Sequence, residues 1–146
     1  MKRSLLSGLV LFLALACFTN AYGQKSNSRT RAIKTSPAYA TLVLAKVKAE
    51  AEAFKMRETF SVTWPGYKEK QYAITALDRE MRRMRALPVS RVPALTEAYA
   101  KLLLYKVELE GQVITLRQTY GPEWGERRTK EYELTVMRRE LRELLR

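Results

Sequence analysis

Large apolar side chains recur at helical spacing in two stretches of the chain, residues 65–87 and 125–146. Their steps alternate between three and four residues, which places them along one stripe of an α-helix and is typical of a coiled-coil seam. The two predicted packing seams are Ile74, Leu77, Met81 and Met84 in the first stretch, and Leu134, Met137, Leu141 and Leu144 in the second.

The stretches 37–60 and 94–120 are also predicted to be helices, but they begin with segments that are apolar almost all round. A helix of this kind has to be covered by more than one neighbour. The prolines support these four ranges, because after residue 36 they all lie at a predicted boundary, where the missing N–H does no harm. The boundary prolines are Pro37, Pro65, Pro88, Pro93 and Pro122.

The second pair of predicted helices repeats the first at a constant offset along the chain. Ala38-Tyr39-Ala40 recurs as Ala98-Tyr99-Ala100, and Arg79-Glu80 recurs as Arg139-Glu140. The gaps inside each pair are short, so each pair is expected to fold back as an antiparallel αα-hairpin. The predicted fold is therefore all-α, a tandem αα-hairpin repeat with a 60-residue period that forms an antiparallel coiled coil or four-helix bundle.

The repeat also predicts a division of the chain and a pairing of the helices. Hairpin 1 covers 37–87, a linker flanked by prolines covers 88–93, and hairpin 2 covers 94–146. One hairpin buries too little apolar surface to balance the entropy of ordering about 50 residues. The apolar bases of the two hairpins are therefore expected to pack together, or hairpins to pair between chains. In hairpin 1 the expected opposite pairs are Phe54 with Ile74, Val47 with Met81, and Val43 with Met84.

The segment 1–23 has the pattern of an export signal. Lys2 and Arg3 precede an apolar run, and Ala21-Tyr22-Gly23 fits the small-x-small pattern of a signal-peptidase site, which leaves Gln24 as the new N-terminus. The expected location is periplasmic or secreted. The alternative is a lipoprotein anchored through Cys17, although the position three before it holds Ala14 where a lipobox usually has Leu.

Residues 24–36 are polar, basic and aperiodic, and we expect a disordered linker there. The whole chain has a formal charge of +12, and this segment carries four Lys or Arg residues without an acidic residue. Residues 94–146 are close to balanced, with ten basic and nine acidic side chains. One interpretation is that this charge only keeps a disordered tail soluble. The other is a binding tail, which in an exported protein would suit an anionic polysaccharide or a lipid surface better than a nucleic acid.

The sequence argues against an enzyme and predicts no cofactor, no metal site and no catalytic residue. Histidine is absent and Cys17 is the only cysteine. This removes Ser-His and Cys-His nucleophiles and zinc sites with a His ligand. The acidic residues lie beside Lys and Arg at helical spacing, as solvated ion pairs do. Lys46, Glu50 and their repeats Lys106 and Glu110 lie near the apolar faces and are expected to pair with charges across the hairpin.

Each predicted turn between paired helices carries an aromatic residue four positions before a tryptophan: Phe60 before Trp64, and Tyr120 before Trp124. One interpretation is that each pair packs together and locks its turn. The other is that the turns form exposed aromatic and basic tips that contact sugar rings or a lipid interface. The candidate tip residues are Trp64, Tyr67, Lys68, Lys70, Trp124, Arg127, Arg128 and Lys130.

The turn motif, an aromatic residue, three further residues and then Trp64-Pro65, resembles the extended periplasmic hairpin of polysaccharide co-polymerases, the chain-length determinant proteins. The opening Ser36-Pro37-Ala38-Tyr39-Ala40 is similar to that of small exported bacterial coiled-coil proteins of unassigned function. The resemblance covers the hairpins only. It implies a long helical hairpin in the cell envelope and carries no activity or binding residue.

Together these patterns predict an exported, non-enzymatic helical scaffold or interaction protein of the bacterial envelope. Its apolar seams would mediate self-association or hold a protein partner. The alternative is a binding module for anionic polysaccharide or a membrane surface, acting through the basic tail and the hairpin tips.

Overall fold

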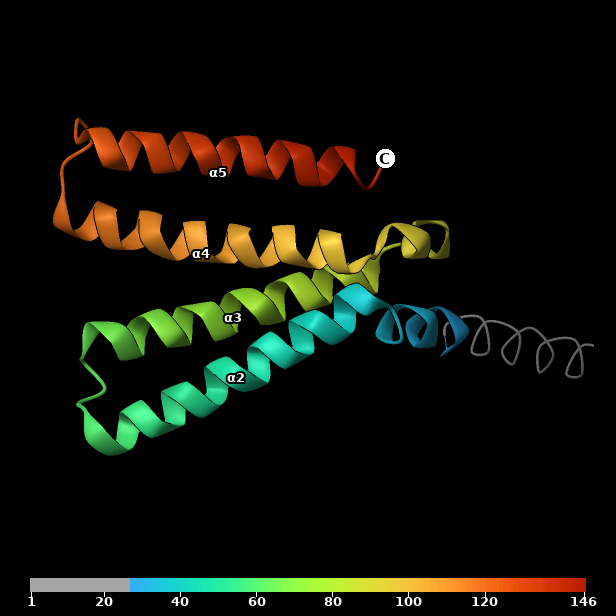
Figure 1. Cartoon of the computed structure of the whole chain (residues 1–146), viewed down its shortest axis with the longest axis horizontal. Coiled ribbons are helices and arrows are strands. Elements are labelled where there is room, and N and C mark those ends of the chain that lie inside the picture. The colour runs from blue at the N-terminus through green and yellow to red at the C-terminus, as the bar shows by residue number, and fades with distance from the viewer. Residues whose placement is uncertain (1–26) are drawn as a thin grey trace, which may run out of the picture.

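The computed structural model describes residues 27–146, which are helical for most of their length. Figure 1 shows two long hairpins, one formed by α2 (Pro37–Thr59) and α3 (Pro65–Ala86) and the other by α4 (Glu97–Thr119) and α5 (Gly125–Glu143). A short 3₁₀ segment, η1 (Val89–Ala94), joins them. The predicted all-α hairpin bundle is confirmed. None of the helices in this part of the chain is long and apolar enough to cross a bilayer.

Equivalent polar caps start the first helix of each hairpin. The side chain of Ser36 accepts a hydrogen bond from the backbone N–H of Tyr39, and the side chain of Thr96 does the same for Tyr99. Such caps satisfy an N–H group that has no partner within the helix. The cap at Thr96 explains why α4 begins at Glu97 rather than at residue 94 as predicted, because residues 89–94 form η1 instead.

The segment 24–36 was expected to be disordered, and this is wrong for residues 27–34, which are helical. Ile33 is fully buried, and Arg29 donates a hydrogen bond from Nη2 to the carbonyl oxygen of Arg85 at 3.0 Å. A cation bonded to the last turn of a helix also interacts favourably with the helix dipole. The Arg29 bond attaches this segment to the end of α3, and Ile33 joins the main apolar core. The predicted export signal, 1–23, lies outside the described residues.

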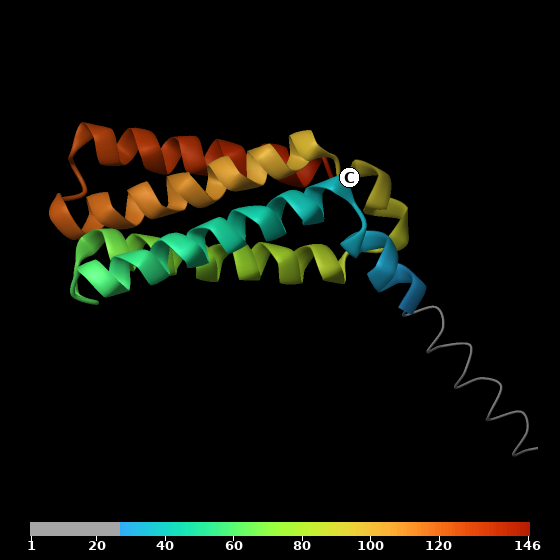
Figure 2. The same cartoon turned by 60° about the horizontal axis from the view of Figure 1, so that its bottom comes forward.

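Helix α4 is the central element of the bundle. It packs against both helices of hairpin 1 as well as against α5, whereas α5 makes its main contacts with α4. Figure 2 shows the same arrangement from another side, with α4 between α5 and the helices of hairpin 1. The burial around α4 agrees with the prediction that an all-round apolar helix needs several neighbours. Its buried residues are Tyr99, Ala100, Leu103, Lys106, Val107, Leu109, Glu110 and Val113.

Helix α2 buries a different stripe from the one predicted. Its buried residues are Ala38, Leu42 and Ala53, whereas Val43 and Val47 are exposed. The expected pairs of Val47 with Met81 and Val43 with Met84 are therefore wrong. An all-round apolar helix offers two alternative stripes, and the small alanine side chains of the buried one leave room for close packing against a neighbour.

Most residues of the predicted seams of α3 and α5 are buried or partly buried. Leu77, Met81 and Met84 are buried on α3, as are Leu134 and Leu141 on α5. Ile74 and Met137 are partly buried. Leu144 is the exception, because α5 ends at Glu143 and the side chain of this C-cap residue is about half exposed.

Candidate functional site

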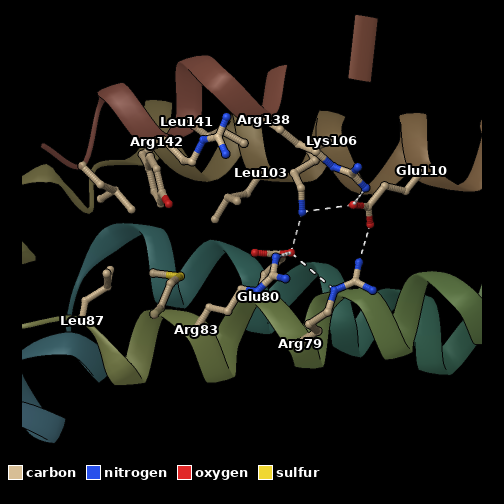
Figure 3. A pocket seen from close by; sticks show the side chains of 13 residues that line it. Arg79, Glu80, Arg83, Leu87, Leu103, Lys106, Glu110, Arg138, Leu141 and Arg142 are labelled. Carbon is tan, nitrogen blue, oxygen red and sulfur yellow. Dashed lines mark hydrogen bonds and ion pairs between the residues drawn. The ribbon is translucent and has the colours of Figure 1, made fainter. Parts of the chain in front are cut away.

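A cleft of about 620 Å³ opens between α3 and α5, with α4 contributing the wall between them. We call it the inter-hairpin cleft. Figure 3 shows that charged side chains from all three helices converge in its interior. Apolar residues line the part nearer the C-terminal ends of α3 and α5. The lining consists of Arg79, Glu80, Arg83, Met84, Leu87, Tyr99, Leu103, Lys106, Glu110, Arg138, Leu141, Arg142 and Leu145.

Two glutamate side chains and one lysine side chain are buried in this cleft. Lys106 Nζ donates to Glu80 Oε1 at 2.6 Å and also lies 3.2 Å from Glu110 Oε1. All three side chains are about 95% buried. A buried ion pair holds its helices in one register, because any displacement would leave a charge without its partner. Lys106 and Glu80 therefore fix the position of α4 against α3.

Arginines and a tyrosine at the edge of the cleft complete the network. Arg138 donates to Glu110 Oε1 at 2.9 Å, and Arg83 donates to Glu80 Oε1 at 2.9 Å. Arg79 donates to Glu110 Oε2, which also accepts a hydrogen bond from the Tyr72 hydroxyl at 3.1 Å. Glu110 thus joins α3, α4 and α5 at one carboxylate. The cations around the two carboxylates outnumber them, so the cleft has an excess of positive charge.

The pKa of Glu110 reflects two opposing effects. Burial acts to raise the pKa of this carboxyl, but the hydrogen bond from Arg138 and the charges of Lys106 and Arg79 outweigh it and hold the pKa at about 2. A carboxyl with so low a pKa stays ionised at neutral pH and is a weak base. Glu110 is accordingly suited to holding cations together rather than to moving protons.

The sequence indicated that Lys106 and Glu110 would pair across their own hairpin, with charges such as Glu140 and Arg139. In the structure Lys106 pairs with Glu80 and Glu110 pairs with Arg79, so both pairs join hairpin 1 to hairpin 2. Sequence spacing could not show this, because it reports which residues share a helix face and not which helix covers that face. The repeat-related Lys46 pairs inside hairpin 1 instead, with Asp78 at 2.8 Å.

The tip residues predicted from the turns come together in two clusters at the same end of the molecule (Figure 1). Phe60 stacks on Trp64 with ring centroids 4.4 Å apart, and Tyr120 stacks on Trp124 at 4.7 Å. These stacks match the interpretation that each aromatic pair locks its turn. A Cβ atom at Gly66 would overlap the Trp64 ring, so the first stack also depends on that glycine.

Most of the predicted tip cations are engaged in ion pairs. Lys70 pairs with Glu52 at 2.6 Å, Arg127 with Glu131 at 3.1 Å, and Lys130 with Glu133 at 3.0 Å. Within residues 27–146, Lys68 and Arg128 are the two tip cations outside these pairs, and both are exposed. Tyr67 lies partly buried in a surface groove shared with Phe54 and Ile74. The tips are thus less basic than the sequence suggested.

No protein family model, curated protein or solved structure matches this chain. The resemblance of the hairpins to the periplasmic arm of polysaccharide co-polymerases stays a prediction.

Proposed function

We propose that this protein is an exported, non-enzymatic helical scaffold of the bacterial cell envelope that binds its partner through an apolar helix surface. The observation that carries the proposal is an exposed apolar stripe on α2. Contiguous exposed apolar surface on a soluble protein is a common mark of a protein interface. The stripe consists of Ala40, Val43, Leu44, Val47, Ala51 and Phe54.

The stripe follows the helical repeat along most of α2. Its members recur at steps of three, one, three, four and three residues, so they lie on one side of the helix. This side is distinct from the buried one formed by Ala38, Leu42 and Ala53. The second apolar side is therefore in excess of what the fold of hairpin 1 requires, which supports a role in association.

The alternative function is binding to an anionic polysaccharide or membrane surface. It is favoured by the two aromatic stacks at one end of the molecule, where both could touch the same surface (Figure 1). The ion pairs of Lys70, Arg127 and Lys130 weigh against it, because they neutralise much of the charge that would attract an anionic polymer.

Capture of partners from envelope extract, with the purified protein as bait, tests the proposal. We expect capture that survives about 1 M salt, where the screening length is only about 3 Å, and that is lost in Leu44→Asp. The control is Val62→Asp, because Val62 is as exposed as Leu44 but lies in a turn. If capture disappears in salt and is insensitive to Leu44→Asp, the result contradicts the scaffold function and favours binding to an anionic polysaccharide or membrane surface.

The export part of the proposal predicts a mature protein that begins at Gln24 and carries no lipid. The signal pattern ends at Gly23, and removal of residues 1–23 would also remove Cys17. Intact-mass measurement of exported protein checks this. A mass that corresponds to a diacylated Cys17 terminus would instead place the protein on a membrane.

A further inference from the structure

Hairpin 2 docks onto hairpin 1 through α4, which packs against both α2 and α3, and one face of α4 meets α3. Leu103 and Val107 on this face are 3% and 6% exposed, and the neighbouring Lys106 and Glu110 make the ion pairs with α3 described above. The receiving surface on α3 includes Ala76 and Met84, 0% and 2% exposed, together with the charged and hydroxyl partners of α4. Those partners are Tyr72, Arg79 and Glu80.

The α4 docking face has an exposed counterpart on α2. In the internal repeat, Leu103, Lys106, Val107 and Glu110 correspond to Val43, Lys46, Val47 and Glu50. We call this set the front face. The two charged residues are identical in type and the two apolar residues remain apolar. Val43 is 38% exposed and Val47 is 54% exposed, and both belong to the stripe that carries the proposed function.

The receiving surface of α3 has an exposed counterpart on α5. We call this counterpart the rear face, and it consists of Tyr132, Val136, Arg139, Glu140 and Leu144. In the same repeat these residues correspond, in this order, to Tyr72, Ala76, Arg79, Glu80 and Met84 of α3. Three of the five residue types are identical and the other two remain apolar. Tyr132 is 72% exposed and Leu144 is 52% exposed.

The front face therefore matches the surface with which hairpin 2 docks onto hairpin 1. The rear face matches the surface of hairpin 1 that receives hairpin 2. The two faces belong to hairpins on opposite sides of the molecule (Figures 1 and 2), so one chain cannot bring them together. We infer that the partner is a second copy of this chain, which places its front face on the rear face of the first and so continues the contact between the hairpins from one molecule to the next.

The inferred contact repeats three pairs that the chain already makes internally. The Lys106–Glu80 pair becomes a pair between Lys46 of the second copy, which leaves Asp78 of its own hairpin, and Glu140 of the first copy. The contacts of Glu110 with Tyr72 and Arg79 become contacts of Glu50 of the second copy with Tyr132 and Arg139 of the first. Because the front face binds a rear face and not another front face, each added copy leaves one front face and one rear face of the assembly free. The association is therefore head-to-tail and can grow beyond a dimer. This inference rests on the proposed function, because it names the partner of the α2 stripe.

Sedimentation velocity on the exported protein tests this arrangement. We expect the wild type to form larger species as its concentration rises. Val47→Asp blocks the front face and Leu144→Asp blocks the rear face, so each variant alone should stay monomeric. Mixed in equal amounts, the two variants should form a dimer, because the intact rear face of Val47→Asp binds the intact front face of Leu144→Asp. Nothing larger should form, because the remaining front face and rear face of that dimer are both blocked.

Both side chains are about half exposed in the single chain, so each variant is expected to fold, which circular dichroism verifies. Val62→Asp, an equally exposed turn valine, is the matched control and should associate like the wild type. A wild type that is monomeric at all concentrations overturns the inference, as does a mixture that stays monomeric. The proposed function fails separately, if capture of envelope partners is insensitive to Leu44→Asp.

Discussion

Leu141→Asp is expected to unfold the protein or to leave it with almost no stability. Leu141 is 6% exposed and belongs to the main apolar core, so the substitution removes its packing and places a charge without a partner among apolar side chains. Loss of the leucine packing alone costs about 2–5 kcal/mol, and the buried charge adds to that cost. The sum is comparable to the whole stability of a domain this size, about 5–15 kcal/mol. Thermal unfolding followed by circular dichroism measures the effect.

Leu144→Asp provides the control on the same helix for the loss of stability. The sequence spacing put both leucines in one seam, but the structure leaves Leu144 about half exposed. Measured at a dilution where the chain is monomeric, this variant should change the free energy of unfolding by less than about 1 kcal/mol. Equal losses at the two positions would mean that α5 is rotated relative to the position described above.

Glu110→Ala is expected to be the most destabilising substitution in the polar network. It removes the carboxylate shared by Lys106, Arg79 and Arg138 and leaves a buried ammonium group with fewer counter-charges. Breaking a buried pair in this way costs about 3 kcal/mol or more. Denaturant unfolding, again of the monomer, gives the difference in free energy.

The control for this substitution is Glu50→Ala, the same change at the repeat-related position of α2. The Glu50 side chain is 51% exposed, and its pair with Lys46 is a surface contact at 3.4 Å. Such a pair contributes about 0–1 kcal/mol. If Glu50→Ala cost as much as Glu110→Ala in the monomer, the buried network would not be what joins the hairpins.

The same carboxyl gives a pH test with a definite sign. The pKa of Glu110 is about 2 in the folded chain, below its ordinary value near 4.5. Its contribution to stability is therefore fully present above about pH 4.5 and is lost as the pH falls toward 2. Across this window Glu110→Gln should lose less stability than the wild type. A parallel pH dependence of the two proteins would contradict the low pKa.

The four long helices and the turns within the hairpins were predictable from the sequence because they depend on local signals. Pro37 marks the start of α2, and the aromatic residue before each tryptophan marks the turns, whereas the start of α4 was placed at residue 94 because the cap at Thr96 was not recognised. The side of α2 that faces the core was not predictable. Both of its sides are apolar, and the positions of the neighbouring helices α3 and α4 decide between Leu42 and Val47.

The inter-hairpin cleft was only partly predictable for a related reason. Spacing identified Lys106 and Glu110 as charged residues near an apolar face, but it could not show that their partners Glu80 and Arg79 lie on the other hairpin. The helix at 27–34 was missed because its sequence is polar apart from Ile33 and a few small residues. Its contacts with the end of α3 come from the tertiary fold, which no local pattern contains.

The central position of α4 has a consequence for how the molecule opens. Since α5 makes its main contacts with α4, it can separate while the three other long helices stay assembled. Separation of α4 breaks its packing against α2 and α3 as well as the buried ion pair of Lys106 with Glu80. Local unfolding should therefore proceed in an order, with α5 opening at the lowest free energy and the amides of α4 exchanging with solvent last.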